Sequence, residues 1–403
     1  MTPIDRRNFI KALAAAPAAS ILTIPAHAQS GQPKARVVVI GGGFGGATAA
    51  KYVKMLDPAI EVTLVEPNKV YTSCPLSNEV ISGHRDLASL QTGYDGVRKR
   101  GVNVLHDLVE VVDPVKKTVR TKGGKTLSYD ALVMSPGIDF KYDSVEGYSE
   151  QVAETLPHAY KAGAQTVLLK KQLEAMPDGG VFIISVPPRP IRCPPGPYER
   201  AAQVAWYCKT HGKPKAKVLI LDANDSHSKQ ALFRQAWREL YGYGKGQMIE
   251  WVPAAEDGKV VRVDPKTRTA YTGFGEHKAD VLNLIPLHHA GNIAIKTGLA
   301  NERGWCEVVP MTMESAVHKD IYPIGDACIA GELPVYDMPK SAHMANTQAK
   351  VAAGAIVAKL NGLPPPTPWY VNTCYSLAGE NYGFSVVHIY RCLLYTSPSP
   401  RDS

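Results

Sequence analysis

The fold of this chain is decided by the stretch RVVVIGGGFGG, which occupies residues 36–46. The branched apolar residues at 37–40 predict a strand that is buried on both faces. The glycines that follow fit the pattern G-x-G-x-x-G at Gly41, Gly43 and Gly46. In that pattern Gly41 permits a tight turn, Gly43 lets a pyrophosphate approach the backbone, and Gly46 lets helix and strand pack closely. The stretch therefore predicts the beginning of a dinucleotide-binding βαβ unit.

The residues after the glycines complete this unit. A helix is expected from Ala47 to about Leu56, because a proline two residues later cannot continue it. A second strand at 60–65 ends in Glu66, whose carboxylate can accept a hydrogen bond from a ribose hydroxyl. A glycine pattern alone is weak evidence, but here strand, glycines, helix, strand and acid occur in order. We predict an adenine dinucleotide site, with FAD and NAD both open at this point.

Length and charge restrict the class of protein. A chain of 403 residues suggests two or three domains with ample core. The formal net charge of +8 is spread along the chain, so no nucleic-acid-binding stripe is indicated. A mildly basic surface suits an acidic partner or an anionic substrate, although most such excesses are only solvated surface. No run of apolar residues is long enough to predict a transmembrane helix, and no metal site is predicted.

The N-terminus is typical of a targeting segment. It carries the twin-arginine pair Arg6 and Arg7, an apolar run at residues 12–24 and the small-x-small sequence AHA at residues 26–28. An uncleaved amphipathic helix is the alternative. Because twin-arginine export carries folded, cofactor-loaded proteins, we expect a signal peptide at residues 1–28 and a mature protein in a bacterial periplasm.

The C-terminal segment of the sequence does not have the pattern of a folded element. Residues 391–403 show neither periodicity nor capping residues and look like a translated sequencing adapter. We exclude them from fold reasoning, and we expect the C-terminal domain to be truncated.

A second βαβ unit is expected in the middle of the chain. Its first strand lies at residues 179–186, but the sequence that follows is PPRPIRCPPGP, residues 187–197, in place of a glycine loop. Prolines have no N–H to offer a pyrophosphate. A helix from Ala201 and a strand ending at Asp222 keep the skeleton. We predict a Rossmann-like domain without a nicotinamide site, which disfavours an NAD-linked disulfide reductase.

Two turns and their neighbours favour FAD. A strand that ends in Pro136 and Gly137 is expected to return the chain to the cofactor, although any strand can end in such a turn. A later strand ends in Gly325 and Asp326, where FAD proteins bind the ribityl chain.

Two further residues lie near the predicted cofactor. Cys74 lies in a predicted loop, residues 67–79, that faces the cofactor, although an isolated cysteine is more often a small buried hydrophobe. A helix predicted at 340–360 begins with Lys340 and Ser341, and its N-terminus can stabilise negative charge on a reduced flavin.

Together these features resemble one family over roughly residues 36–390: the flavoprotein subunit of flavocytochrome c sulfide dehydrogenase, a relative of the sulfide:quinone oxidoreductases. The most specific matching stretches are YTSCPLSNE at 71–79, RCPPGPYER at 192–200, IGDAC at 324–328 and NTCYS at 372–376. The resemblance implies an α/β fold with two Rossmann-like domains of the glutathione-reductase-like type and a C-terminal interface domain. The expected boundaries are 1–28 signal peptide, 34–148 first segment of the FAD-binding domain, 149–282 second Rossmann-like domain, 283–362 second segment of the FAD-binding domain, 363–390 start of the C-terminal domain and 391–403 non-native tail.

The resemblance also implies roles for individual residues. Cys74 would carry FAD through a thioether to the flavin 8α-methyl group. Cys193 and Cys374 would form a redox-active disulfide, with Glu199 as an acid/base beside it. Asp326 would hold the ribityl chain. A purely structural disulfide is the alternative for the cysteine pair.

These roles imply a reaction and a partner. Hydrosulfide would attack the disulfide and leave a persulfide and a thiolate, while Lys340 and the adjacent helix N-terminus would steady the reduced flavin. The chain has no Cys-x-x-Cys-His haem motif, so we expect electrons to pass to a separate c-type cytochrome subunit in a heterodimer. A sulfide:quinone oxidoreductase and a non-catalytic electron-transfer flavoprotein subunit are the alternatives. Pro75, directly after Cys74, departs from the family pattern.

Overall fold

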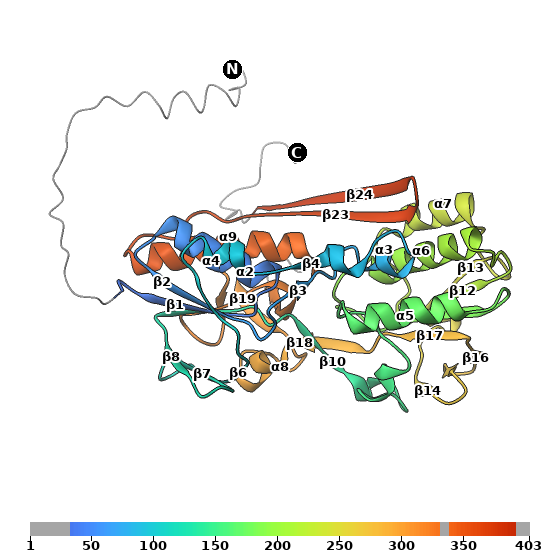
Figure 1. The fold of residues 1–403 in the computed structure, drawn as a ribbon, viewed down its shortest axis with the longest axis horizontal. Coiled ribbons are helices and arrows are strands. Elements are labelled where there is room, and N and C mark those ends of the chain that lie inside the picture. Colours follow the sequence, from blue (N-terminus) through green and yellow to red (C-terminus); the bar gives the residue numbers. More distant parts are fainter. Residues whose placement is uncertain (1–32, 331–337, 392–403) are drawn as a thin grey trace, which may run out of the picture. The chain divides into compact units, whose positions relative to one another are not determined.

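The computed structural model describes residues 33–330 and 338–391. The predicted signal peptide at 1–28 and nearly all of the predicted non-native tail lie outside the described residues. Residues from Lys34 onward belong to one compact unit. Two parallel sheets organise it, joined by a two-stranded ribbon (Figure 1).

The first sheet has five parallel strands in the order β21-β9-β1-β2-β5. These strands are β1 Arg36–Ile40, β2 Glu61–Val65, β5 Asn103–Leu105, β9 Ala131–Met134 and β21 Ile321–Pro323. Two helices, α2 Phe44–Leu56 and α9 Ala342–Leu360, pack against each other beside this sheet (Figure 1). Helix α2 begins three residues earlier than predicted, directly after Gly43, because glycines 45 and 46 continue the helix.

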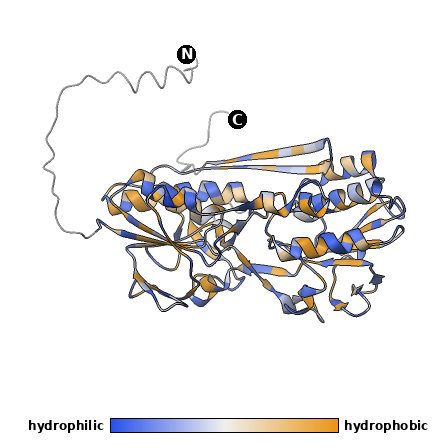
Figure 2. Ribbon diagram, viewed as in Figure 1, coloured by the Kyte–Doolittle hydropathy of each residue, from blue (hydrophilic) through white to orange (hydrophobic). Residues whose placement is uncertain are grey.

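The second sheet has four parallel strands in the order β13-β12-β11-β17. Its strands are β11 Val181–Val186, β12 Lys217–Asp222, β13 Ile249–Val252 and β17 Val281–Leu284, and its helices are α5 Ala164–Ala175, α6 Gly196–Thr210 and α7 Gln230–Leu240. The prediction of an α/β fold with two Rossmann-like domains is confirmed. Both sheets are hydrophobic along their strands, while the outer faces of the helices carry polar residues (Figure 2).

An antiparallel ribbon of β10 Ile138–Lys141 and β18 Leu287–Ala290 carries the chain from the first sheet to the second and back (Figure 1). Small antiparallel or mixed sheets flank the two main ones. They consist of β6 Val109–Asp113, β7 Thr118–Thr121 and β8 Thr126–Ser128; β14 Arg262–Asp264, β15 Thr269–Tyr271 and β16 Glu276–Lys278; and β19 Cys306–Val309, β20 Glu314–Ser315 and β22 Cys328–Ala330.

The C-terminal region of the described chain is a long hairpin of β23 Trp369–Gly379 and β24 Tyr382–Arg391. Strand β23 contacts both α9 and α6, so it reaches from the first domain to the second (Figure 1). Its side chains alternate: Tyr370, Asn372 and Ser376 are buried, whereas Tyr375 is exposed.

Two local predictions were wrong. The stretch 67–79, predicted as a loop, contains β3 Tyr71–Thr72 and the start of α3 Ser77–Ile81. Helix α6 begins at Gly196 rather than Ala201, because Pro197 is tolerated in a first turn that needs no amide donors.

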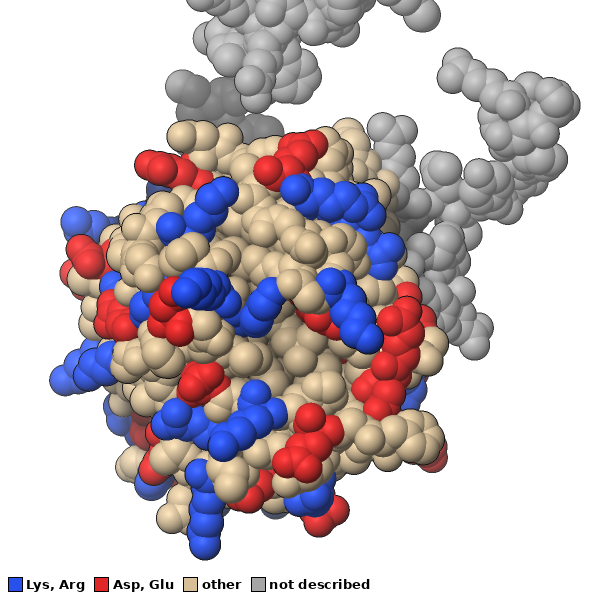
Figure 3. Space-filling model, turned by 90° about the vertical axis from the view of Figure 1, so that its right-hand side faces the viewer, with Lys and Arg blue, Asp and Glu red and all other residues tan. Residues whose placement is uncertain are grey.

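Two further observations concern helix length and the distribution of surface charge. None of the helices within the described ranges is both long and apolar enough to cross a membrane. The face shown in Figure 3 has Lys and Arg side chains intermixed with Asp and Glu.

Candidate functional site

The glycine loop between β1 and α2 is a close-packed backbone turn. Gly41 has a φ of +92°, and a Cβ atom there would lie 2.2 Å from the carbonyl oxygen of Ser135. A Cβ atom on Gly46 would lie 1.8 Å from the carbonyl oxygen of Gly41. Gly43 is the N-cap of α2, and no side chain caps this helix. Its first amide groups are therefore available to a phosphate.

The acid at the end of β2 faces this loop. The Glu66 carboxylate accepts hydrogen bonds from the Gly42 amide at 2.8 Å and from the Asn68 amide at 2.9 Å. The buried hydroxyl of Tyr94 has no hydrogen-bond partner among the described residues, and it lies 2.5 Å from where a Cβ atom on Gly42 would be. A glycine cradle, a ribose-binding acid and an unused buried donor together fit the adenosine diphosphate moiety of FAD.

The predicted turns lie at the carboxyl ends of neighbouring strands. Pro136 and Gly137 follow β9, and Gly325 and Asp326 follow β21, which pairs with β9. Both glycines have left-handed backbone, with φ of +71° at Gly137 and +73° at Gly325. In open α/β sheets, ligands bind outside the carboxyl ends of the strands. The structure therefore places these four residues at the same sheet edge as the glycine loop.

Arg192 connects the two domains at this edge. Its Nε lies 3.5 Å from Oδ2 of Asp326. Burial lowers the pKa of Arg192, but the Asp326 carboxylate is among the neighbouring groups that raise it more, so the pKa is raised overall. The guanidinium thus remains charged among the predicted FAD-binding residues. Sequence reasoning gave Arg192 no role, although it stands in the most specific motif.

Cys193 lies next to Arg192 in the loop between β11 and α6. Its amide donates to the carbonyl of Lys340 at 2.8 Å, and its carbonyl accepts from the Gly196 amide at 2.8 Å. Its φ of +50° is unusual for a residue with a side chain. Burial raises the pKa of the Cys193 thiol, and the neighbouring Arg192 guanidinium opposes this shift only in part.

Glu199 lies in the first turn of α6 and holds this region together. Its Oε1 accepts from the amide of Leu377 in β23 at 2.8 Å, and its Oε2 accepts from Nδ2 of Asn78 in α3 at 3.0 Å. Burial raises the pKa of Glu199. Three segments far apart in the sequence thus meet at one carboxylate. Asn78, like Arg192, had no predicted role.

Cys374 lies in β23 and Cys74 just before α3. The carbonyl of Cys374 accepts from Nζ of Lys229 at 2.6 Å. The Cys74 sulfur accepts from the amide of Ala162 at 3.2 Å. Every cysteine among the described residues is a free thiol. The Cys193–Cys374 disulfide and the Cys74 thioether thus stay predictions. The elements next to the three cysteines are joined at Glu199, whose carboxylate accepts hydrogen bonds from α3 and β23.

The Lys340 side chain makes its hydrogen bonds to the turn at Asp326 and not to the N-terminus of α9. Its Nζ donates to the carbonyls of Asp326 and Cys328, each at 2.8 Å, and lies 3.7 Å from the ring centroid of Trp305. Burial lowers the pKa of this ammonium to about 8. Helix α9 begins two residues later, with Ser341 as its N-cap. The stabilisation of a reduced flavin by Lys340 stays a prediction, and the observed contacts make it a positioning residue for the Asp326 turn.

The acid of the second βαβ unit is hydrogen-bonded by side chains of its own domain. Asp222, at the end of β12, is fully buried and accepts from the hydroxyl of Tyr198 at 2.6 Å and from Nε1 of Trp251 at 2.9 Å. Its other oxygen accepts from the Asn224 amide at 3.0 Å. That the second domain has no nicotinamide site stays a prediction.

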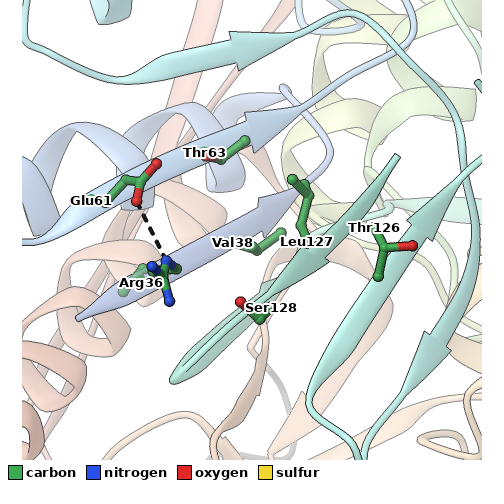
Figure 4. A pocket seen from close by; sticks show the side chains of 8 residues that line it. Arg36, Val38, Glu61, Thr63, Thr126, Leu127 and Ser128 are labelled. Carbon is green, nitrogen blue, oxygen red and sulfur yellow. Dashed lines mark ion pairs between the residues drawn. The ribbon is translucent and has the colours of Figure 1, made fainter. Parts of the chain in front are cut away.

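A small cavity elsewhere does not belong to this site. It has a volume of about 320 Å³ and lies at the amino ends of β1 and β2, beside β8 (Figure 4). The Arg36 Nε and Glu61 Oε2 atoms, 3.6 Å apart, contribute to its wall. Because the glycine loop leaves the opposite end of β1, this cavity is not the dinucleotide site.

Comparisons with known proteins agree with this geometry. Residues 35–172 match the family model of pyridine nucleotide-disulphide oxidoreductases, and residues 166–286 match the central region of the flavoprotein chain of flavocytochrome c sulfide dehydrogenase. The chain is therefore a flavoprotein of the disulfide oxidoreductase class. It belongs to the family of sulfide-oxidising flavoproteins that comprises sulfide dehydrogenases and sulfide:quinone oxidoreductases, for which FAD is the expected cofactor.

Three relatives illustrate the similarity. The sulfide dehydrogenase (flavocytochrome c) flavoprotein chain of Chlorobaculum thiosulfatiphilum is 64% identical over 45 residues, which are 11% of this chain and 94% of that sequence. The mitochondrial sulfide:quinone oxidoreductase of Mus musculus is 24% identical over 299 residues, which cover 72% of this chain but only 65% of the mouse protein. The solved structure of the sulfide:quinone oxidoreductase from Aquifex aeolicus superposes with a TM-score of 0.71 at 20% identity, covering 88% of this chain and 87% of that one. This last likeness shows the fold.

Proposed function

We propose that this protein oxidises hydrogen sulfide through a Cys193–Cys374 disulfide and FAD, and passes the electrons to a c-type cytochrome subunit. The observation that carries the proposal is that the Glu199 carboxylate, in the helix that follows Cys193, accepts a hydrogen bond from β23, the strand that holds Cys374, while Arg192 pairs with the Asp326 turn. A fold that needed only to hold FAD would not require two cysteines and a buried carboxylate at this position.

The residues present can perform the first step. Hydrosulfide attacks the disulfide at Cys193, which leaves a persulfide there and a thiolate on Cys374. The Arg192 guanidinium and the N-terminus of α6 favour negative charge at Cys193. Glu199, with its raised pKa, can hold or release a proton closer to neutral pH than an exposed carboxyl can. Bound FAD supplies a two-electron acceptor that can release its electrons singly.

The chain's own residues define how FAD would be held. Gly41, Gly43 and Gly46 would receive the pyrophosphate and Glu66 the ribose, while Asp326 would hold the ribityl chain and Cys74 would bond the flavin. We expect a denatured mass spectrum to retain the mass of FAD on a peptide that contains Cys74, and to lose it in Cys74→Ala. Complete release of FAD from the denatured wild-type chain would contradict covalent attachment and leave the sulfide reaction open.

The electron acceptor needs its own test, because sulfide:quinone oxidoreductases are also among the relatives. Purified, flavin-loaded protein is mixed with sulfide and either cytochrome c or a soluble quinone. We expect faster reduction of the cytochrome. Faster reduction of the quinone would assign the chain to the second type.

We also propose that the protein works in a bacterial periplasm after twin-arginine export. Cell fractionation should find the protein in the periplasm, and a pair of lysines in place of Arg6 and Arg7 should retain it in the cytoplasm. An unchanged distribution in the lysine variant would refute this route.

A further inference from the structure

The hydroxyl of Tyr160 is an unexplained buried donor near the proposed reaction centre. Tyr160 is only 6% exposed, and its Oη has no hydrogen-bond partner among the described residues. Leaving a buried hydroxyl unpaired costs on the order of 1–3 kcal/mol. An unpaired buried hydroxyl in a folded protein needs an explanation. A bound ligand that accepts its hydrogen bond is one such explanation.

The surroundings of Gly196 show which groups lie near the Tyr160 hydroxyl. A Cβ atom on Gly196 would lie 2.8 Å from Oη of Tyr160 and 3.2 Å from Sγ of Cys193. The hydroxyl and the sulfur therefore both lie close to Gly196, and a side chain at residue 196 would enter the space between them. The backbone of Gly196 is not in the left-handed region. Glycine is therefore required here because there is no room for a side chain, and not because of the backbone conformation.

The loop around this space is poor in other donors. Pro195 and Pro197 flank Gly196 and carry no N–H, and the Gly196 amide is used by the carbonyl of Cys193. A 15-residue helix, α6, begins here, but its first turn offers fewer amide groups than usual. Tyr160 thus supplies from outside the loop a donor that the loop itself lacks.

Tyr160 is held firmly in this position. Arg200 lies with its guanidinium carbon 5.2 Å from the centroid of the Tyr160 ring, and its Nη2 donates to the carbonyl of Ala159 at 2.7 Å. The Tyr160 amide donates to Nδ1 of His158 at 3.0 Å. A donor whose neighbours fix it needs little reorganisation to bind a developing charge.

We propose that the Tyr160 hydroxyl donates a hydrogen bond to the outer sulfur of a persulfide on Cys193, beside Gly196. This rests on the proposed function. In the step concerned, hydrosulfide sulfur forms a bond to Sγ of Cys193 while the bond from Cys193 to Cys374 breaks. Two electrons pass from sulfide to the Cys374 sulfur, which leaves as a thiolate, and the proton stays on the outer sulfur until it is lost.

The geometry of a persulfide agrees with this assignment. An S–S bond of about 2.05 Å keeps the outer sulfur close to Sγ, and Sγ and the Tyr160 hydroxyl lie 3.2 Å and 2.8 Å from one point, the Cβ position at Gly196. Burial raises the pKa of Tyr160, so the phenol stays protonated and acts as a donor. A hydrogen bond to a charged acceptor is stronger than one to a neutral acceptor, which favours the ionised persulfide.

The test uses Tyr160→Phe in the flavin-loaded protein, with Tyr129→Phe as the matched control. Tyr129 also has a buried hydroxyl without a partner among the described residues, but it lies next to β9 in the first domain. One equivalent of sulfide is added without oxygen, and the Cys193 persulfide is alkylated at a series of pH values and measured by mass spectrometry. We expect Tyr160→Phe to raise the midpoint of persulfide alkylation by about one pH unit and to slow flavin bleaching about tenfold, with Tyr129→Phe unchanged. An unmoved midpoint in Tyr160→Phe overturns the proposal.

A second variant tests the space itself. Gly196→Ala should reduce the yield of Cys193 persulfide at least about tenfold, because the new methyl group occupies the site. Gly96→Ala, where a Cβ atom meets nothing within 4 Å, is its control. If the wild-type protein forms no persulfide on Cys193, the proposed function itself fails. If wild type forms it and Gly196→Ala forms it equally well, only the inference about Tyr160 and its site fails.

Discussion

The two βαβ units of this protein share a skeleton and differ at the same two places, the loop after the first strand and the acid after the second. In the first unit the loop is glycine-rich, and the Glu66 carboxylate accepts a hydrogen bond from the Gly42 amide of that loop. In the second unit the loop is proline-rich and carries Cys193, while Asp222 is closed off by Tyr198 and Trp251.

The difference shows how one frame can serve two purposes. Uncapped amide groups at a helix N-terminus suit a dinucleotide, and the first unit offers them beside Glu66. The second unit has prolines at the corresponding helix start, and its loop carries a cysteine next to Arg192, with Glu199 hydrogen-bonded to the hairpin β23–β24. We infer that the second domain keeps its fold as a scaffold for redox chemistry rather than for a second nucleotide.

The largest expected effect comes from the cysteine of the second loop. Cys193→Ala should slow sulfide-dependent bleaching of the flavin by at least about 1,000-fold, because no disulfide remains to be attacked. Stopped-flow absorbance without oxygen measures this rate. Cys208→Ala, at a buried free cysteine within α6, should bleach at nearly the wild-type rate. Equal rates for the two variants would refute the disulfide mechanism.

The next effect comes from the glycine loop of the first unit. Gly46→Ala places a Cβ atom 1.8 Å from the Gly41 carbonyl oxygen, so the loop must distort at a cost of about 3 kcal/mol. We expect the purified variant to lose most of its FAD, measured by absorbance after precipitation of the protein. Gly96→Ala provides the control and should retain its FAD. A Gly46→Ala protein with full FAD content would show that this loop does not bind the cofactor.

A smaller effect is expected where the second unit is closed. Tyr198→Phe removes one of the donors to buried Asp222 and should lower the free energy of unfolding by about 2 kcal/mol. Urea denaturation measures this change. Tyr129→Phe removes a hydroxyl that has no partner among the described residues and should cost much less. We expect no affinity for NADH to appear in Tyr198→Phe, and an NADH-dependent stabilisation would contradict the loss of the nicotinamide site.

The smallest effect concerns the joint between the two sheets. His158 packs on Phe140 of β10 with ring centroids 4.2 Å apart, and burial lowers its pKa to about 3. The unfolded chain takes up this proton as the pH falls below the ordinary value near 6.5, but the folded chain does not. Stability is therefore lost as the pH falls, by about 1 kcal/mol between pH 6.5 and 5.5.

His158→Asn should reduce this slope, because the amide oxygen can replace the Nδ1 acceptor used by the Tyr160 amide without titrating. His388→Asn, at an exposed position, should leave the slope as it is. Denaturation midpoints measured at several pH values decide the matter, and a slope that is the same in all three proteins would contradict this assignment.

Much of the fold was predictable because its signals are local. The buried strands 37–40 and 217–222 are continuous apolar runs, and the glycine loop has a fixed spacing. The α3 turn was missed because its residues are held by tertiary contacts such as that between Asn78 and Glu199. These residues lie far apart in the sequence, and no pattern within either segment indicates the contact.

The candidate site was predictable to a similar extent. Motifs identified the glycines, the cysteines and Asp326, and the resemblance supplied their proposed roles. The ion pair of Arg192 with Asp326 crosses between the two domains, and the unpaired hydroxyl of Tyr160 depends on the space beside Gly196. Both features arise only from packing. Lys340 was expected at the flavin, but its contacts to two carbonyls follow from the path of the loop after β21.

The central claim is that the first unit holds a flavin that responds to sulfide, while the second unit cannot deliver a hydride from a nicotinamide. The most direct measurement mixes one flavin-loaded sample, without oxygen, with sulfide in one experiment and with NADH in another, and follows flavin absorbance. The account predicts rapid bleaching with sulfide and none at catalytic rates with NADH. Bleaching by NADH with no response to sulfide would contradict it.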